Sequence, residues 1–488
     1  MTSHLLTAIV FLPLVGAVAC ALAPNPRVAR ALALVTSGAV LAFTVWLVAG
    51  FDTGAGMQLV ERARWIPQIG SDYHLGVDGI SLPMLALSAL LSVLAVVASW
   101  NVTERPKTYF ALLMLLEVGM NGVFVALDFV LFYVFWELVL VPMYFLIAWW
   151  GGPRRQYASL KFFLYTLFGS VFMLVGIIAL YLHPEGGTLD MVALAGRTFP
   201  KQFQMWVFAA FFVGFAVKVP VFPLHTWLPD AHVEAPTAAS VLLAGILLKM
   251  GTYGFIRVAL PILPDASRAW APAIAALAAI SIVYGAALAF AQKDLKKLVA
   301  YSSVSHMGFV MLGIAAGTPE GLSGAVAVMF SHGVVTGMLF LLVGMVYERT
   351  HTRMIEDVSG LSSQVPVAGG LLAFASFASL GLPGLSGFVG EFLSLLGAWK
   401  STLFSGGWVV VSAVGVLLAA AYMLTMVQRV VLGEPSKAVA GMTDLTLREI
   451  GVLVPLATLT LVVGVWWDSL LRYVAPVAAE LAQRVMGS

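Results

Sequence analysis

Six ionisable residues lie well inside long apolar stretches of the sequence, where only hydrocarbon side chains would be expected. They are two acids, two lysines and two histidines, on six different stretches: Glu137, Glu391, Lys218, Lys249, His306 and His332. A charged side chain at bilayer depth costs at least about 2.5 to 3.5 kcal/mol on insertion scales, so it is rarely kept there without a partner or a purpose. Acids and bases gathered inside a helix bundle form a hydrated polar strip, which is typical of a proton relay.

Glu137 and Lys218 are expected to form a switch at one end of this strip. Burial favours the neutral form of a lysine, whereas a carboxylate within about 4–6 Å favours the ammonium. Glu137 close to Lys218 would therefore keep the lysine protonated, and separating the two would drive the proton toward Lys249. Histidine both accepts and donates protons near neutral pH, so we expect the two histidines to carry the proton onward to Glu391, the exit.

Each of these residues also has a structural interpretation. Lys218 and Lys249 could be ion-pair partners, but replacing a buried pair by apolar residues is often neutral, so stability alone is a poor reason to keep them. The two histidines could be core residues hydrogen-bonded to Ser305 or Ser331. Glu117 also lies in an apolar stretch, where a place near a helix end would leave it solvated.

The segment after Lys218 contains further polar residues that could suggest a metal site. Its candidate ligands lie in a loop and fit no standard ligand spacing, so we expect no metal there: His225, Asp230, His232 and Glu234. His225 is better interpreted as a side branch of the proton path toward the inside. The glycine-rich run GLPGLSGFVG lacks the features of a Walker loop or a dinucleotide fingerprint, and no cofactor-binding motif is found.

The composition predicts the kind of protein that must position these residues. The chain has 488 residues, of which 61% are hydrophobic and 10% charged, which is typical of a polytopic membrane protein. A net charge of +2 gives no reason to expect nucleic acid as a partner. Cys20 is the only cysteine, so the chain by itself can form neither an internal disulfide nor an iron–sulfur site.

Apolar runs of about 20 residues, the length that spans a bilayer, predict an all-α fold with about fourteen transmembrane helices. They lie near 4–23, 30–50, 79–99, 108–126, 129–150, 160–182, 204–226, 237–259, 270–290, 296–316, 322–347, 367–400, 407–430 and 449–471. Residues 51–78 are expected to form a short hairpin outside the membrane, and the tail 472–488 is short. Lysines and arginines are most abundant in the loops on one side, which places both termini outside.

Two of the expected helices cannot be continuous. Pro220 and Pro223 break the helix over 204–226, and Pro383 with its neighbouring glycines breaks the helix over 367–400. Such breaks are tolerated in a membrane only where protein or a water-filled cavity satisfies the freed backbone groups.

The two breaks suggest an internal repeat, since each falls in the fourth member of a five-helix unit. Five is an odd number, so the two units must cross the membrane in opposite senses, which is an inverted repeat. We therefore expect three scaffold helices over 1–107, one unit over 108–259, an inverted unit over 260–430, and a last helix with its tail over 431–488.

Several long motifs resemble the antiporter-like subunits of respiratory complex I, the proton-translocating NADH:quinone oxidoreductase. They are FWELVLVPMYFLI, KVPVFPLHTWLPDAHVEAPTAASVLLAGILLKMGTYG, QKDLKKLVAYSSVSHMGFV and GLPGLSGFVGEF, and YERTHTRMIEDVSGL is similar to the M-type group, the bacterial counterpart of mitochondrial subunit 4. These motifs occur in the family's order and extend over nearly the whole chain. The short tail favours the M type over the L type, which adds a long lateral helix.

The resemblance implies a function and a site. It implies fourteen helices, inverted five-helix units and a proton channel, with Glu137 and Glu391 as the family's acids, Lys218 and Lys249 as its lysines, and the two histidines as connecting residues. It also implies that NADH, FMN, iron–sulfur clusters and quinone are bound by partner subunits. Those partners would be L-type and N-type antiporter-like neighbours and small membrane subunits, in a bacterial inner membrane.

Three other interpretations are compatible with parts of the sequence. The D subunit of Mrp-type Na⁺/H⁺ antiporters shares the same core and lysines. A proton-pumping membrane arm coupled to a hydrogenase, or a ferredoxin-dependent complex I-like enzyme, would need the same helices. A purely structural membrane scaffold is disfavoured by the number of costly ionisable residues.

Overall fold

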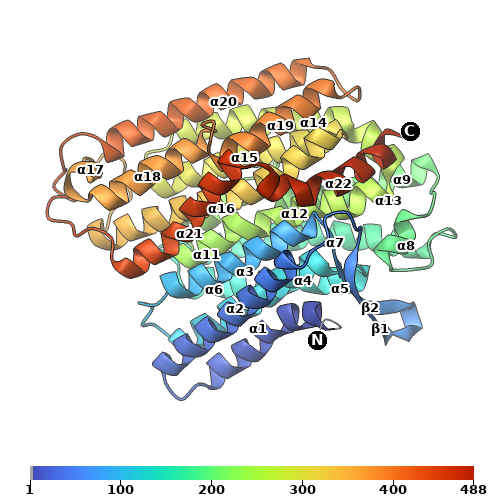
Figure 1. Cartoon of the computed structure of the whole chain (residues 1–488), viewed down its shortest axis with the longest axis horizontal. Coiled ribbons are helices and arrows are strands. Elements are labelled where there is room, and N and C mark those ends of the chain that lie inside the picture. Colours follow the sequence, from blue (N-terminus) through green and yellow to red (C-terminus); the bar gives the residue numbers. More distant parts are fainter. Residues whose placement is uncertain (1–3, 488) are drawn as a thin grey trace.

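The computed structural model describes residues 4–487, and most of these are helical. The long helices lie side by side and cross the view in Figure 1 in a similar direction. Within residues 4–487, twelve helices are long and apolar enough to cross a membrane. The chain is therefore a multi-pass membrane protein, as its composition predicts.

The twelve long helices follow one another along the whole chain. They are α1 (Leu5–Leu22), α2 (Pro26–Ala49), α3 (Ser81–Ala98), α4 (Pro106–Val125), the pair α5 (Phe129–Leu138) and α6 (Leu140–Trp150), α7 (Arg155–Leu182), the segment Thr237–Ile262, α14 (Pro264–Phe290), α15 (Leu295–Ala316), α16 (Pro319–Thr350), the segment Gly407–Val431 that begins with α20 (Gly407–Met426), and α21 (Leu447–Val465). The segment Thr237–Ile262 consists of α11 (Thr237–Leu242), α12 (Leu248–Gly254) and α13 (Leu260–Ile262), joined by π-helical turns at Leu243–Leu247 and Phe255–Ala259.

Two of the expected spans are absent from this set because they are interrupted. The span expected near 204–226 consists of α9 (Lys201–Lys218) and an irregular stretch, after which α10 (Trp227–Glu234) begins. The span expected near 367–400 consists of α18 (Pro366–Ser379) and α19 (Ser386–Lys400). Both interruptions fall at the prolines that predict them. Helix length and composition therefore account for twelve spans and leave the status of these two segments open.

Neighbouring side chains satisfy the backbone groups freed at the first break. The indole of Trp227 donates to the carbonyl of Val217 over 2.9 Å, and the amide of Phe222 donates to the hydroxyl of Ser281 over 3.0 Å. Ser281 belongs to α14, so a helix far along the chain completes the break. Protein side chains thus provide the hydrogen bonds that the freed backbone groups need at membrane depth.

Glycine makes the second break possible. Gly381 and Gly384 have φ angles of 78° and 92°, a conformation that a side chain disfavours. A Cβ atom on Gly381 would lie 2.8 Å from Oε2 of Glu391, whereas a Cβ on Gly384 would meet nothing within 4 Å. Gly381 thus lets a carboxylate approach the backbone of the break.

The C-terminal tail is more structured than the sequence suggests. The last long helix, α21, ends at Val465 rather than near residue 471, and a further helix, α22 (Asp468–Met486), follows after a bend. Its residues Leu470, Tyr473 and Val474 are buried, and α22 packs on α16 and α14. This helix is amphipathic, and polar residues such as Arg472 and Glu480 lower its mean hydropathy. A search for apolar runs therefore does not detect it, which is why the sequence predicts only a short tail.

The helices differ in how much of their surface they bury. The spans Thr237–Ile262 and α16 are wholly enclosed by protein over their apolar windows, and α15 almost wholly, whereas most of the windows of α2, α7 and α21 is not buried. The enclosed helices carry Lys249, His306 and His332. The fold therefore places the ionisable residues in its interior and surrounds them with lipid-facing helices.

The segment between α2 and α3 forms the expected hairpin, with β1 (Gln58–Ile66) antiparallel to β2 (Ser71–Val77). Asp78 follows β2 directly, is 3% exposed, and pairs with Arg257 over 2.5 Å. Burial opposes its ionisation, but the charge and hydrogen bond of Arg257 hold the pKa of Asp78 below its usual value. The hairpin is thereby tied to the segment that carries Lys249.

We expect Asp78→Asn to destabilise the subunit strongly at neutral pH, by about 3–5 kcal/mol, because it leaves Arg257 buried without its counter-charge. The matched control is Asp72→Asn, since Asp72 forms its ion pair with Arg62 at an exposed site, and such pairs contribute about 0–1 kcal/mol. Thermal unfolding of the purified protein in detergent measures both. Equal losses for the two variants would contradict this role of the buried pair.

Candidate functional site

Four of the six predicted residues lie in one row across the centre of the bundle. Nζ of Lys249 lies 2.6 Å from Nδ1 of His332, and Nδ1 of His306 lies 3.0 Å from Oε1 of Glu391. The two imidazole rings lie next to each other, with their centroids 5.6 Å apart and their planes tilted by 60°. The row joins α12, α16, α15 and α19, so four helices must pack correctly to form it.

Lys249 is fully enclosed by protein. Its ammonium donates to the carbonyl of Ala244 over 2.5 Å in addition to its contact with His332. Ala244 belongs to the π-helical turn that directly precedes α12, and such turns occur frequently at functional sites. Sequence reasoning did not find this turn, because hydrophobic periodicity does not distinguish it from a continuous helix.

A small cavity separates the two histidines. It measures about 10 Å³ and is lined by both imidazoles together with Ser331, Ser379 and Glu391, among others. This is room for roughly one water molecule beside several polar groups. Within residues 4–487, Nε2 of His332 has no hydrogen-bond partner, and Nε2 of His306 lies 3.2 Å from the hydroxyl of Ser379.

Lys218 and Glu137 form a looser arrangement in the other half of the chain. Lys218 ends α9 and is 1% exposed, and its Nζ lies 5.1 Å from the ring centroid of Trp136. Among the described residues, Nζ of Lys218 and Oε1 of Glu137 have no hydrogen-bond partner. The two side chains form no ion pair with each other, although Glu137 lies within electrostatic reach of Lys218. The ammonium is held chiefly by the indole face.

Lys218 and Lys249 are not joined by a hydrogen bond in the described part of the chain, but His232 lies near the second lysine. His232 in α10 is fully buried and stacks on Phe340 with a centroid distance of 4.6 Å. Neither ring nitrogen of His232 has a partner within residues 4–487. The only sequence signal was its place in the loop considered for a metal.

The expectation that Asp230, His232 and Glu234 lie in a loop is wrong, because all three belong to helix α10, and the two carboxylates serve as ion-pair partners. Asp230 pairs with Lys161 over 2.8 Å and with Arg154 over 3.3 Å, and Glu234 accepts a hydrogen bond from the backbone of Arg154. His225 lies in the break itself, buried beside Phe222 and Tyr284, and within residues 4–487 it makes no hydrogen bond to the row. No group of metal-binding side chains is found within residues 4–487.

Two further buried ionisable residues extend the set. Lys296, which the sequence places in a basic inside loop, is 7% exposed, and its Nζ donates to the carbonyl of Ala235 over 2.5 Å. Glu117 lies in the middle of α4 rather than near its end and is fully buried, and its carboxylate oxygens have no partner among the described residues. Single-residue hydropathy could not separate these buried positions from solvated ones.

Comparison with known proteins identifies the family. Residues 126–419 match the family model described as NADH:quinone oxidoreductase/Mrp antiporter, transmembrane, and residues 56–121 match NADH-ubiquinone oxidoreductase chain 4, amino terminus. The chain is 44% identical to NADH-quinone oxidoreductase subunit M of Rhodobacter capsulatus, with 98% of this chain and 96% of that protein aligned. It is 45% identical to NAD(P)H-quinone oxidoreductase chain 4 1 of Synechococcus sp. (strain JA-3-3Ab), with 94% and 89% aligned.

A solved structure agrees with this result. A chain of respiratory complex I from Thermus thermophilus with bound NADH matches the fold with a TM-score of 0.91 and 34% identity, covering 99% of this chain and 100% of that one. Both the sequence and the fold thus match over nearly their full length. The chain therefore belongs to the NADH:quinone oxidoreductase/Mrp antiporter family of membrane proteins, and within it to the subunit M, or chain 4, group.

Proposed function

We propose that this chain translocates protons across a bacterial inner membrane as a subunit of an NADH:quinone oxidoreductase. The observation that carries the proposal is the row from Lys249 through His332 and His306 to Glu391, four proton-exchanging groups from four helices in an enclosed interior. Partner subunits would hold NADH, FMN, iron–sulfur clusters and quinone, and quinone reduction there would drive the protons here.

The row supports a stepwise transfer. A charged Lys249 would donate to Nδ1 of His332, 2.6 Å away, and a proton passed to that imidazole would leave from Nε2, which has no hydrogen-bond partner among the described residues. The imidazole of His332 also lines the small cavity. A water molecule there would hydrogen-bond to both histidines and connect them. His306 then donates to Glu391 beside the second helix break, where the proton leaves the row.

Lys218 and Glu137 are proposed as the part of the path that changes state. The ammonium lies against an indole face without a hydrogen bond, and such a contact contributes about 2 kcal/mol when desolvated. Movement of Glu137 relative to Lys218 would therefore change the protonation of the lysine with few bonds to break. His232 would connect this region to Lys249, and His225 would branch toward the inside.

We also propose how the helices are arranged in the whole chain. The two interrupted segments would complete fourteen spans, with both termini on the outer side. Residues 108–259 and 260–430 would form two inverted five-helix units behind the scaffold of 1–107, with 431–488 closing the bundle. L-type and N-type antiporter-like subunits and small membrane subunits would be the neighbours.

Isolation of the chain with its native neighbours tests the kind of complex. We expect flavin-containing and iron–sulfur subunits to co-purify with it, because the chain holds no motif for either group. Co-purification with membrane subunits alone would favour an Mrp-type antiporter, and a hydrogenase or ferredoxin-linked partner would indicate one of the related complexes.

We expect Lys218→Met to abolish proton pumping and NADH-driven quinone reduction in sealed membranes while leaving the complex assembled. The substitution keeps the length of the side chain and removes its proton. Lys201→Met is the matched control, because Lys201 lies at the exposed start of the same helix, and it should pump normally. Normal pumping at normal turnover in assembled Lys218→Met would remove Lys218 from the mechanism.

Gly381→Ala and Gly384→Ala test the exit of the row. Both alanines would adopt a positive φ, which costs roughly 1–2 kcal/mol at each position. Only the Cβ at 381 would contact the carboxylate of Glu391 and displace it from His306. Pumping by reconstituted complex should therefore fall severely in Gly381→Ala and little in Gly384→Ala. A similar loss in both would assign the effect to backbone strain.

A further inference from the structure

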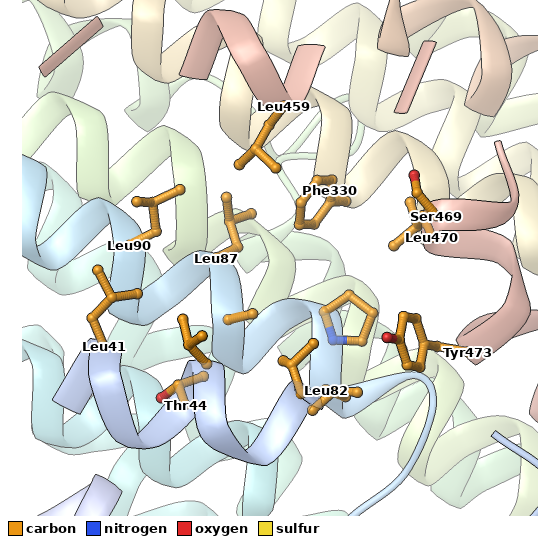
Figure 2. A pocket seen from close by; sticks show the side chains of 14 residues that line it. Leu41, Thr44, Leu82, Leu87, Leu90, Phe330, Leu459, Ser469, Leu470 and Tyr473 are labelled. Atoms are coloured by element: carbon orange, nitrogen blue, oxygen red, sulfur yellow. The ribbon is translucent and has the colours of Figure 1, made fainter. Parts of the chain in front are cut away.

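A cavity of about 370 Å³ lies where the first helices of the chain meet the last ones (Figure 2). Its walls come from α2, α3, α16, α21 and α22. Leu41 of α2, Leu87 and Leu90 of α3 and Leu459 of α21 form one end, and Ser469 and Tyr473 of α22 lie at the other. The volume falls within the range of about 300–1,000 Å³ that is typical of small-molecule sites.

The two ends of this cavity differ in chemistry. The leucine end is mainly apolar, as a hydrocarbon chain would require, and its one hydroxyl, that of Thr44, donates to the backbone carbonyl of Val40. At the α22 end, the buried hydroxyl of Ser469 has no hydrogen-bond partner among the described residues, and the hydroxyl of Tyr473 accepts from Arg472 over 2.8 Å. Arg472 itself is exposed, so its guanidinium remains available to an anion. The site thus combines an apolar slot with a cationic, hydroxyl-bearing end.

We propose that this cavity binds one phospholipid, with an acyl chain along α3 and α21 and the phosphate beside Arg472 and Tyr473. The charge of Arg472 complements a phosphate, and the slot complements hydrocarbon. A helix of a neighbouring subunit fits less well. A helix with its side chains is about 10–12 Å across, so a cavity of about 370 Å³ would hold only a few of the side chains of that helix.

The bound acyl chain would lie close to the proton-exchanging row. Leu87, which lines the cavity, packs so tightly against Gly333 that a Cβ there would clash, and Gly333 follows His332 in α16. Phe330, two residues before His332, also lines the cavity. The cavity therefore borders α16 within two residues of His332, which contacts Lys249. The lipid site itself does not depend on the proposed proton path.

Photolabelling tests the site in the intact complex. The complex would be reconstituted in phosphatidylethanolamine vesicles containing phosphatidylglycerol with a diazirine in one acyl chain, and labelled peptides mapped by mass spectrometry. We expect labelling of α3 and α21 at the cavity. Ala86→Trp, which fills the cavity, should lose this labelling and keep that of the exposed face of α7, whereas Val175→Trp on α7 should keep the cavity labelling.

A second variant tests the polar end and does not alter the core. Arg472→Gln changes an exposed side chain, and it should remove the preference of the cavity for phosphatidylglycerol over a diacylglycerol carrying the same diazirine chain. Three results would overturn the proposal: cavity labelling that Ala86→Trp does not reduce, equal labelling by both lipids in the unaltered complex, or displacement of the label by an isoprenoid quinone at equal mole fraction.

Discussion

The enclosed ammonium of Lys249 is the constraint on which the interior depends. Bulk water does not reach this ammonium, so protein groups must supply its hydrogen-bond partners. These partners are the carbonyl of Ala244 and the imidazole of His332. A carbonyl can accept a second donor beside its backbone partner, and the π-helical turn brings this one to the side chain. The contact with His332 in turn fixes α12 against α16, and the helices around them separate the site from bulk water.

The two helix breaks serve this interior in different ways. At the first break, Trp227 and Ser281 replace the missing helical bonds, so the chain can leave helical geometry directly after Lys218. At the second, a glycine without a side chain leaves room for the carboxylate of Glu391 beside the backbone. In both cases an ionisable side chain lies where the regular ladder of hydrogen bonds stops, and where small backbone movements cost least.

The two halves of the site differ in how tightly they are bonded. Short polar contacts join Lys249 to His332 and His306 to Glu391, with the two histidine rings 5.6 Å apart, whereas Lys218 rests on an indole and forms no ion pair with Glu137 among the described residues. A tightly bonded row favours rapid proton exchange among its members. A loosely held lysine responds to the position of one carboxylate, because Coulomb energy in a poorly polarisable interior changes steeply with distance. The division suits a path with one adjustable part and one fixed part.

The sequence by itself determined the membrane-spanning character of the chain, the places of both breaks, the hairpin between the second and third long helices and the six ionisable residues, because each follows from local composition or from the chemistry of proline. Only the tertiary structure decided which of those residues meet. Lys249 and His332 are 83 positions apart, and His306 and Glu391 are 85 apart, so their contacts depend on how four helices rotate and pack. The same reason hid the burial of His232, Lys296 and Glu117, the helix formed by the C-terminal tail, and the gap between Glu137 and Lys218. Helix periodicity reports the face of a helix, but not the neighbour that covers it.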